Sequence, residues 1–245
     1  MSYDKKDDDT DRSWPKGEKK AKFKTETSHK VRLAEKLIEI AAPNFGAMET
    51  KIIGSSAYVS NRFSQRDTLM ADRERTAEQI QKDKNLEKSN RKPANYQKRY
   101  ENSKHVSEEG WCGIPCAAFR SAMISACRLV NYKMTIAKLS IFVLPDGIDR
   151  DEGTPLVRIY GKVERNDSRT RNDDGSLGFS ARAMWREWYC KLRLQWDADQ
   201  FSDKSILNLL ARVGMQVGVG EGRHDSRSSN GMGWGTFAID RGGRR

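Results

Sequence analysis

The sequence has few of the residues on which metal sites and nucleophilic catalysis usually depend. It contains three histidines and four cysteines in 245 residues. The first two cysteines, Cys112 and Cys116, do not have the spacing of a zinc-binding pair, and no histidine pair completes a tetrahedral set. No histidine has a companion serine or cysteine in a recognisable nucleophile elbow. We therefore expect no metal, no disulfide, no cofactor and no catalytic residue.

Long apolar runs and nucleotide-binding signatures are also missing. No apolar run approaches the roughly 20 residues that span a bilayer, and the first eleven residues are polar and acidic, unlike a signal peptide. The Gly-Lys-Ser/Thr triplet of a P-loop does not occur, and the dinucleotide fingerprint lacks its third glycine because position 223 is Arg223. The sequence predicts a cytoplasmic protein without a membrane partner or a small-molecule substrate.

Charged residues, in contrast, are abundant. They make up 32% of the chain against 36% hydrophobic residues, and the formal net charge is +11. This balance indicates a modest core with long solvated segments, and the positive charge favours polyanionic partners. We interpret residues 1–43 as a flexible charged arm with a short amphipathic helix at 31–40, and residues 242–245 as a basic tail.

The apolar spacing between residues 44 and 241 predicts one α+β domain. Ser202 is suited to cap a helix with the stripe Ile206, Leu209, Leu210 and Val213, which Gly214 would end. A second helix begins near Pro115, with Phe119, Met123, Cys127 and Val130 on one face. Strands are expected at 48–59, 136–144, 156–163, 188–196 and 236–239, and a loop at 166–182. The order approximates βαββαβ, a modified ferredoxin-like (RRM-like) core with an antiparallel sheet.

Residues 62–110 form a large insertion after the first strand. They include almost no aliphatic residues, basic residues outnumber acidic ones, and a helix is expected at 67–87. Tyrosines among lysines and arginines are typical of surfaces that bind nucleic-acid strands; an ordinary solvated loop is the alternative. The candidate contacts in this insertion are Arg91, Lys92, Tyr96, Lys98 and Arg99.

A glycine-rich segment near the C-terminus is the most specific feature. It has six glycines within eighteen residues, together with two arginines and a tryptophan. Glycine adopts positive φ and lets backbone approach a ligand closely, arginine forks suit phosphates, and an indole can stack on a base. The alternative is a loop that merely turns between two elements. The candidate residues are Gly218, Gly220, Gly222, Arg223, Arg227, Gly231, Gly233 and Trp234.

Two motifs resemble the RAMP superfamily, which includes the guide-RNA-binding backbone subunits of CRISPR effector complexes. The first is the helix opening at residues 114–120, Ile-Pro-Cys-Ala-Ala-Phe-Arg, and the second is Gly-Met-Gly-Trp-Gly-Thr-Phe at 231–237. The chain is also similar to phage or prophage proteins that share Gly-Ser-Ser-x-x-x-x-Asn-Arg-Phe, here at 54–63, and Glu187-Trp188. The resemblance implies a ferredoxin-like core, a thumb-like insertion, and a glycine loop in contact with the bound strand.

The same resemblance places further candidate contacts in the core. It implies phosphate contacts from Arg62, after the first strand, and from Arg120, at the helix opening. It also implies that Arg158, Tyr160 and Lys162 form a strand face presented to nucleic acid, with an ordinary solvated sheet face as the alternative.

The leading hypothesis is a non-catalytic, sequence-tolerant binder of single-stranded RNA or DNA that forms a homo-oligomer along the strand. One alternative is a viral structural or assembly protein, and another is a RAMP-type endoribonuclease. His224 and the acidic turn with Asp146, Asp149 and Asp151 are the residues that a nuclease would use, but they form no recognisable catalytic constellation.

Overall fold

The computed structural model describes residues 40–62, 96–171, 177–225 and 231–240. The chain divides into two units, Met1–Ala42 and Pro43–Arg245, and all the elements described below belong to the second unit. The predicted arm helix at 31–40, the insertion helix at 67–87 and the C-terminal tail lie outside the described residues, except for Ile40. Arg91, Lys92 and Arg227 also lie outside them.

The domain is α+β, with a mainly antiparallel sheet. Its main sheet is built from β1 (Phe45–Gly54), β3 (His105–Val106), β4 (Cys112–Pro115), β5 (Ile141–Leu144), β6 (Gly147–Ile148), β7 (Pro155–Tyr160), β10 (Tyr189–Asp197) and β11 (Phe237–Ile239). The strand order is β11-β1-β10-β7-β4-β3, while β5 pairs with β10 and β6 with β7. Every pairing is antiparallel. The chain therefore places β1 and β10, which are distant in sequence, side by side in the centre.

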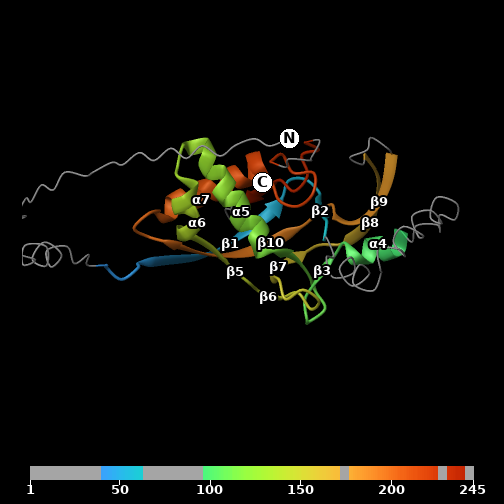
Figure 1. The fold of residues 1–245 in the computed structure, drawn as a ribbon, viewed down its shortest axis with the longest axis horizontal. Coiled ribbons are helices and arrows are strands. Elements are labelled where there is room, and N and C mark those ends of the chain that lie inside the picture. The colour runs from blue at the N-terminus through green and yellow to red at the C-terminus, as the bar shows by residue number, and fades with distance from the viewer. Residues whose placement is uncertain (1–39, 63–95, 172–176, 226–230, 241–245) are drawn as a thin grey trace, which may run out of the picture. The chain divides into compact units, whose positions relative to one another are not determined.

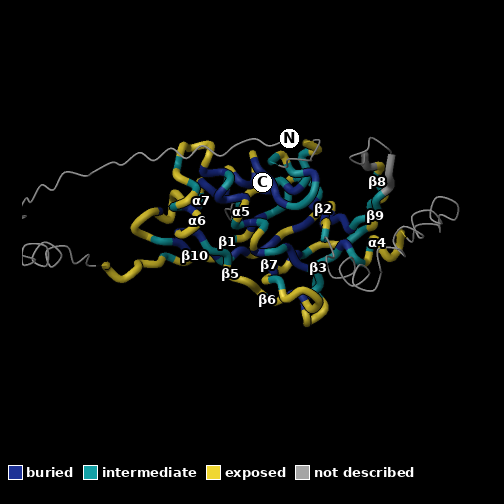
Figure 2. Tube along the Cα trace, viewed as in Figure 1, coloured by how far each residue is buried: buried dark blue, intermediate teal, exposed yellow. Residues whose placement is uncertain are grey.

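Three helices cover one face of this sheet. Figure 1 shows α5 (Cys116–Ala126), α6 (Met134–Ser140) and α7 (Asp203–Arg212) together on one side. The alternation along β10 explains this, because Cys190, Leu192, Leu194 and Trp196 are all buried beneath the helices. Period-two alternation of this kind gives a strand one apolar and one polar face. The core lies between the helices and the sheet, where the tube in Figure 2 is mostly buried.

We call the opposite side of the main sheet the open face. None of the described helices lies over it (Figure 1). The β10 residues that alternate with the buried ones, from Tyr189 to Asp197, are exposed or half-buried. None of the helices in the described ranges is long and apolar enough to cross a membrane.

A second sheet replaces the loop that was expected at residues 166–182. The strands β2 (Tyr58–Ser60), β9 (Leu177–Trp185) and β8 (Val163–Arg171) form a three-stranded antiparallel sheet. The loop prediction is wrong because β9 buries small residues, Ala181 and Ala183, at alternate positions before Trp185. Because the buried positions of β9 include small residues and their neighbours include polar ones, the sequence shows little of the apolar alternation that predicts a strand. The short helix α4 (Tyr96–Asn102) packs on β9, and the Ala183 N–H donates to the Ser103 Oγ at 2.9 Å.

The helix predictions hold in outline, with three corrections. Ser202 caps α7 by accepting a hydrogen bond from the Ser205 N–H at 3.3 Å, as predicted. Gly214 does not end this helix, because a π-helical turn (Val213–Val217) continues it to Gly218, which has φ 75°. Gly214 instead provides space for the Phe237 carbonyl, with which a Cβ would clash.

The other two corrections concern apolar residues that face solvent. Residues 134–140 form α6, and only 141–144 form the strand that was expected from residue 136. Leu139, which the strand prediction placed in the core, is 78% exposed. Val130 is 48% exposed, whereas Phe119, Met123 and Cys127 are fully buried as predicted.

Candidate functional site

A row of aromatic rings and cations crosses the open face. Tyr160 on β7 lies opposite Tyr189 on β10, and their rings stack with centroids 4.6 Å apart at an interplanar angle of 4°. The Arg158 guanidinium lies 5.1 Å from the Tyr160 centroid and 5.6 Å from that of Trp111. The Lys51 ammonium lies 5.1 Å from the Tyr189 centroid. We call Trp111, Arg158, Tyr160, Tyr189 and Lys51 the cation–aromatic row.

The row follows from the strand register. Tyr160 and Tyr189 are direct cross-strand neighbours, and such pairs have their side chains on the same face within contact distance. Arg158 is two residues before Tyr160 and so shares its face. Single-strand binders stack bases on aromatic rings and on arginine guanidinium planes. The row contains both kinds of plane on a surface that the described helices leave uncovered. Each tyrosine ring lies against the other tyrosine and against a cation, so a base that stacks there takes the place of Arg158 or Lys51.

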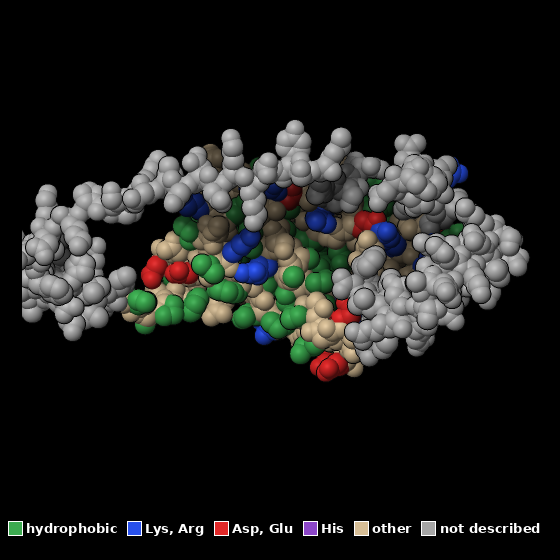
Figure 3. Space-filling model, viewed as in Figure 1, with side chains coloured by type: hydrophobic (Ala, Val, Ile, Leu, Met, Phe, Trp, Pro, Cys, Tyr) green, Lys and Arg blue, Asp and Glu red, His purple; other side chains and the backbone are tan. Residues whose placement is uncertain are grey.

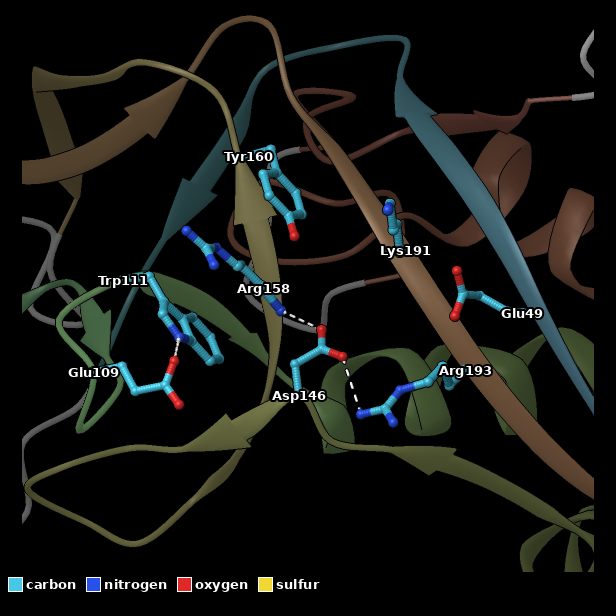
Figure 4. Close-up of a pocket in the computed structure, with 8 residues that line it drawn as sticks. All are labelled: Glu49, Glu109, Trp111, Asp146, Arg158, Tyr160, Lys191 and Arg193. Atoms are coloured by element: carbon cyan, nitrogen blue, oxygen red, sulfur yellow. Dashed lines mark hydrogen bonds and ion pairs between the residues drawn. The ribbon is translucent and has the colours of Figure 1, made fainter.

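A hollow of about 250 Å³ lies beside the row (Figure 4). Asp146 organises it: one oxygen accepts the Arg158 backbone N–H at 2.9 Å, and the other accepts from the Arg193 guanidinium at 3.1 Å. The Trp111 indole N–H donates to the Glu109 carboxylate at 2.9 Å. The lining residues are Glu49, Glu109, Trp111, Asp146, Arg158, Tyr160, Lys191 and Arg193.

Charges of both signs meet in this hollow. Lys191 and Glu49 form no ion pair within the part of the chain that the structure describes, although β1 and β10 are neighbours. On the face seen in Figure 3, lysine and arginine side chains are likewise scattered among apolar and acidic ones. The hollow therefore differs from a uniform basic patch.

The glycine loop has the predicted backbone, but much of its space is filled by the protein. All six glycines have positive φ. A Cβ at Gly220 would lie 2.7 Å from the Val59 carbonyl oxygen, and one at Gly222 would lie 2.7 Å from the Trp234 ring. A Cβ at Gly235 would clash with the Val219 carbonyl oxygen. Gly231, in contrast, has no atom within 4 Å of a built Cβ.

The side chains of the glycine loop are also engaged internally. Arg223 donates to the Gly220 carbonyl oxygen at 3.0 Å. Trp234 covers Gly222 and is half-buried. A Cβ at Gly218 would lie 3.1 Å from the Arg223 side chain and 3.1 Å from the Trp234 carbonyl oxygen, and one at Gly233 would lie 3.4 Å from the His224 ring. These contacts support the alternative that the loop packs between two elements.

Arg62 and Arg120, the two predicted core contacts to phosphate, hold the protein together. The Arg62 side chain is 8% exposed and pairs with Asp151 at 2.8 Å and Glu152 at 3.2 Å. Arg120 donates to the Ile141 carbonyl at 2.9 Å and to the Lys138 carbonyl, at the end of α6. Because both guanidinium groups are engaged by the chain itself, neither belongs to the interface that we propose below.

The two ends of the 62–110 insertion meet at Asp149, which is 1% exposed. One carboxylate oxygen lies 3.6 Å from Arg62, before the insertion, and the other lies 3.3 Å from the His105 Nδ1, near its end. The Asp151 and Glu152 backbone N–H groups also donate to Asp149, at 2.9 and 3.0 Å. Asp149 therefore joins the two ends of the insertion. This structural role explains the acidic residues of the turn without a nuclease activity.

This closure predicts that acid destabilises the protein. Burial lowers the pKa of His105, so the unfolded chain takes up the histidine proton first as pH falls below about 6.5. Burial alone would raise the pKa of Asp149, but the hydrogen bonds from backbone N–H groups and the charge of Arg62 outweigh burial and lower this pKa. The stability that the Asp149 carboxylate contributes is therefore lost only below about pH 3.9. We expect thermal stability to fall between pH 6.5 and 5, and His105→Asn to flatten this part of the profile. Equal pH dependence in the two proteins would contradict the assignment.

The predicted contacts on α4 lie beside the second sheet. Tyr96 is 36% exposed, and the Arg99 guanidinium lies 5.7 Å from its ring centroid. Lys98 is exposed on the same helix. These residues form a separate basic and aromatic surface next to β9.

Sequence reasoning missed most of the residues that the open face brings together. It identified Arg158 and Tyr160, and left out Trp111, Tyr189, Lys191, Arg193 and Lys51. A signal for three of them was present, because Tyr189, Lys191 and Arg193 lie on the polar face of the clearest strand in the sequence.

No family model matches the chain, and no curated protein matches it in sequence.

The described cysteines are free thiols. Cys116, Cys127 and Cys190 are buried, and Cys112 is half-buried. Burial raises the pKa of Cys116 to about 11 and also raises that of Cys190. Because the thiolate is the reactive form, these two thiols are poor nucleophiles at neutral pH. Within the described ranges, no group of three His, Cys, Asp or Glu residues is arranged to hold a metal ion.

Proposed function

We propose that this chain is a non-catalytic, sequence-tolerant single-stranded nucleic-acid-binding protein that assembles side by side along RNA or DNA. The observation that carries the proposal is the cation–aromatic row on the open face, with its stacked Tyr160 and Tyr189. Stacking on such planes tolerates any base, because every base has a π-face, and contributes about 1–3 kcal/mol per base. Lys191 stands beside the row and can neutralise a phosphate, whereas Lys51 pairs with Asp240 at 3.0 Å and Arg193 pairs with Asp146 at 3.1 Å.

We further infer that the core is a ferredoxin-like member of the RAMP superfamily, encoded by a phage or prophage. The strand order supports the ferredoxin-like part of this inference. The units β1–α5–β7 and β10–α7–β11 interlock so that β1 and β10 are neighbours between β11 and β7, as in a split βαβ arrangement. The open sheet face is also the surface on which RRM domains, which have a similar layout, stack RNA bases.

Side-by-side assembly would use exposed apolar side chains on the protein surface. Leu139 on α6 is 78% exposed, Met215 in the π-helical turn is 75% exposed, and Phe45 at the start of β1 is 48% exposed. Exposed apolar side chains of this size are typical of contacts between protein chains when they form a contiguous patch. The same residues also favour the second candidate function, a viral assembly protein whose protomers interlock without nucleic acid.

Fluorescence anisotropy with labelled single-stranded DNA, single-stranded RNA and duplex, over a salt series, tests the proposal. We expect preference for single strands and a steep salt dependence. Lys191→Gln should reduce the salt slope by about one unit, because it removes one phosphate contact. Lys204→Gln is the matched control: it removes another exposed lysine, from α7 on the helix side of the sheet, and should leave the slope unchanged.

Three results would overturn the proposal. Equal, weak binding to all three nucleic acids would show that the charge of the chain attracts polyanions without a site. Oligomers that form without nucleic acid, together with such weak binding, would favour the assembly protein instead. Turnover of RNA or single-stranded DNA that His224→Ala or Asp146→Ala abolishes would favour the endoribonuclease.

A further inference from the structure

We propose that the hollow beside the cation–aromatic row recognises one guanine base of the bound strand. This inference rests on the proposed function, because it names the base that a single strand would place in the hollow. The strand as a whole would still be bound without regard to sequence, while one position per protomer would prefer guanine.

The balance of charge in the hollow favours a base over a phosphate. The three carboxylates Glu49, Glu109 and Asp146 line the hollow together with three cations, Arg158, Lys191 and Arg193, so the lining is neutral as a whole. Carboxylates near a phosphate would repel it, whereas they accept hydrogen bonds from base N–H groups. A ligand that fits this lining has donors on one edge and acceptors on another, with a flat face for Arg158, Tyr160 or Trp111.

Glu49 is the carboxylate best placed to accept hydrogen bonds from a ligand. Its direct cross-strand neighbour is Arg193, but the Arg193 guanidinium is held by Asp146 at 3.1 Å and by the Pro145 carbonyl. Glu49 is exposed and forms no ion pair with another described residue. Glu109 has one oxygen on the Trp111 indole and a second that accepts no described hydrogen bond. Asp146 has both oxygens engaged, so it positions Arg158 and Arg193 (Figure 4).

Guanine matches these groups better than the other bases do. Its Watson–Crick edge carries two neighbouring donors, N1–H and the N2 amino group, which one carboxylate can accept together. Its other edge carries the acceptors O6 and N7, which arginine and lysine recognise. Adenine and cytosine each have one amino group without a neighbouring N–H donor, and thymine and uracil have a single N–H between two carbonyls. Glu49, which can accept from the donors, and the Arg158 guanidinium, which can donate to the acceptors, line the same hollow and therefore suit guanine.

The test is anisotropy with oligo-dT strands that carry one central guanine, adenine, cytosine or inosine, and with the matching oligo-U strands. We expect about tenfold tighter binding of the guanine strand than of the others. Inosine, which lacks the N2 amino group, should lose most of this preference without any change to the protein. Glu49→Gln should reduce the preference to nearly one. Glu108→Gln removes the same charge from an exposed residue outside the hollow and should retain the preference.

The possible failures can be told apart. If all four strands bind with equal affinity and prefer single strands to duplex, the guanine inference is wrong and the proposed function stands. If none of the strands binds, both are wrong. A guanine preference that Glu49→Gln leaves intact would place the recognition elsewhere and overturn the assignment to this hollow.

Discussion

Replacing Gly235 with alanine is expected to lower the free energy of unfolding by about 2–5 kcal/mol. Two effects combine at this residue. Its φ of 71° is a conformation that L side chains adopt at a penalty, and an added Cβ would clash with the Val219 carbonyl oxygen. The backbone cannot move away easily, because Gly235 N–H donates to the Ala57 carbonyl at 2.8 Å and its own carbonyl accepts from Val219 at 3.0 Å. Urea denaturation of the two proteins measures the difference.

Gly231→Ala separates the two effects. Gly231 also has positive φ, at 64°, but nothing lies within 4 Å of a Cβ there. We expect this variant to lose about 1–2 kcal/mol, the conformational penalty alone. Equal losses in the two variants would show that the crowding at Val219 has little effect. If Gly231→Ala remains folded but loses affinity for a single strand, the glycine loop approaches nucleic acid, as the sequence suggested.

The fold was predictable wherever burial alternates with a regular period. On β10, every second residue from Cys190 to Trp196 is buried, and on α7 the stripe from Ile206 to Val213 is buried, as their spacing predicted. The hairpin of β8 and β9 was missed because its inward side chains include alanines, which give little hydrophobic contrast. The short α6 was missed because Leu139 is apolar and exposed.

The candidate site was less predictable, because it depends on which strands are neighbours. Lys51, Arg158 and Tyr189 belong to three strands, and their proximity follows from the register of β1 and β7 with β10. For the glycine loop, the sequence correctly predicted positive φ. Nothing in the sequence indicated that Tyr58, Val59 and Val219 would occupy the space that the glycines leave.

Replacing both stacked tyrosines, Tyr160→Leu with Tyr189→Leu, is expected to weaken single-strand binding about 5- to 150-fold. Leucine keeps apolar bulk but removes the flat face on which a base stacks. Because neither substitution removes a charge, the slope of affinity against salt should stay the same, in contrast to Lys191→Gln. Anisotropy at several salt concentrations measures both quantities, and thermal unfolding checks that the double variant remains folded.

Tyr96→Leu is the matched control for this prediction, because Tyr96 and Tyr189 have the same exposed fraction, 36%. Tyr96 lies on α4 beside the second sheet, where a cation, Arg99, also covers the ring. If the double variant binds as tightly as the wild type while Tyr96→Leu weakens binding, the interface lies on the insertion, as the sequence first suggested. If only the double variant loses affinity for a single strand, binding is assigned to the open face. The comparison is informative because both surfaces carry aromatic and basic side chains and differ in their place in the fold.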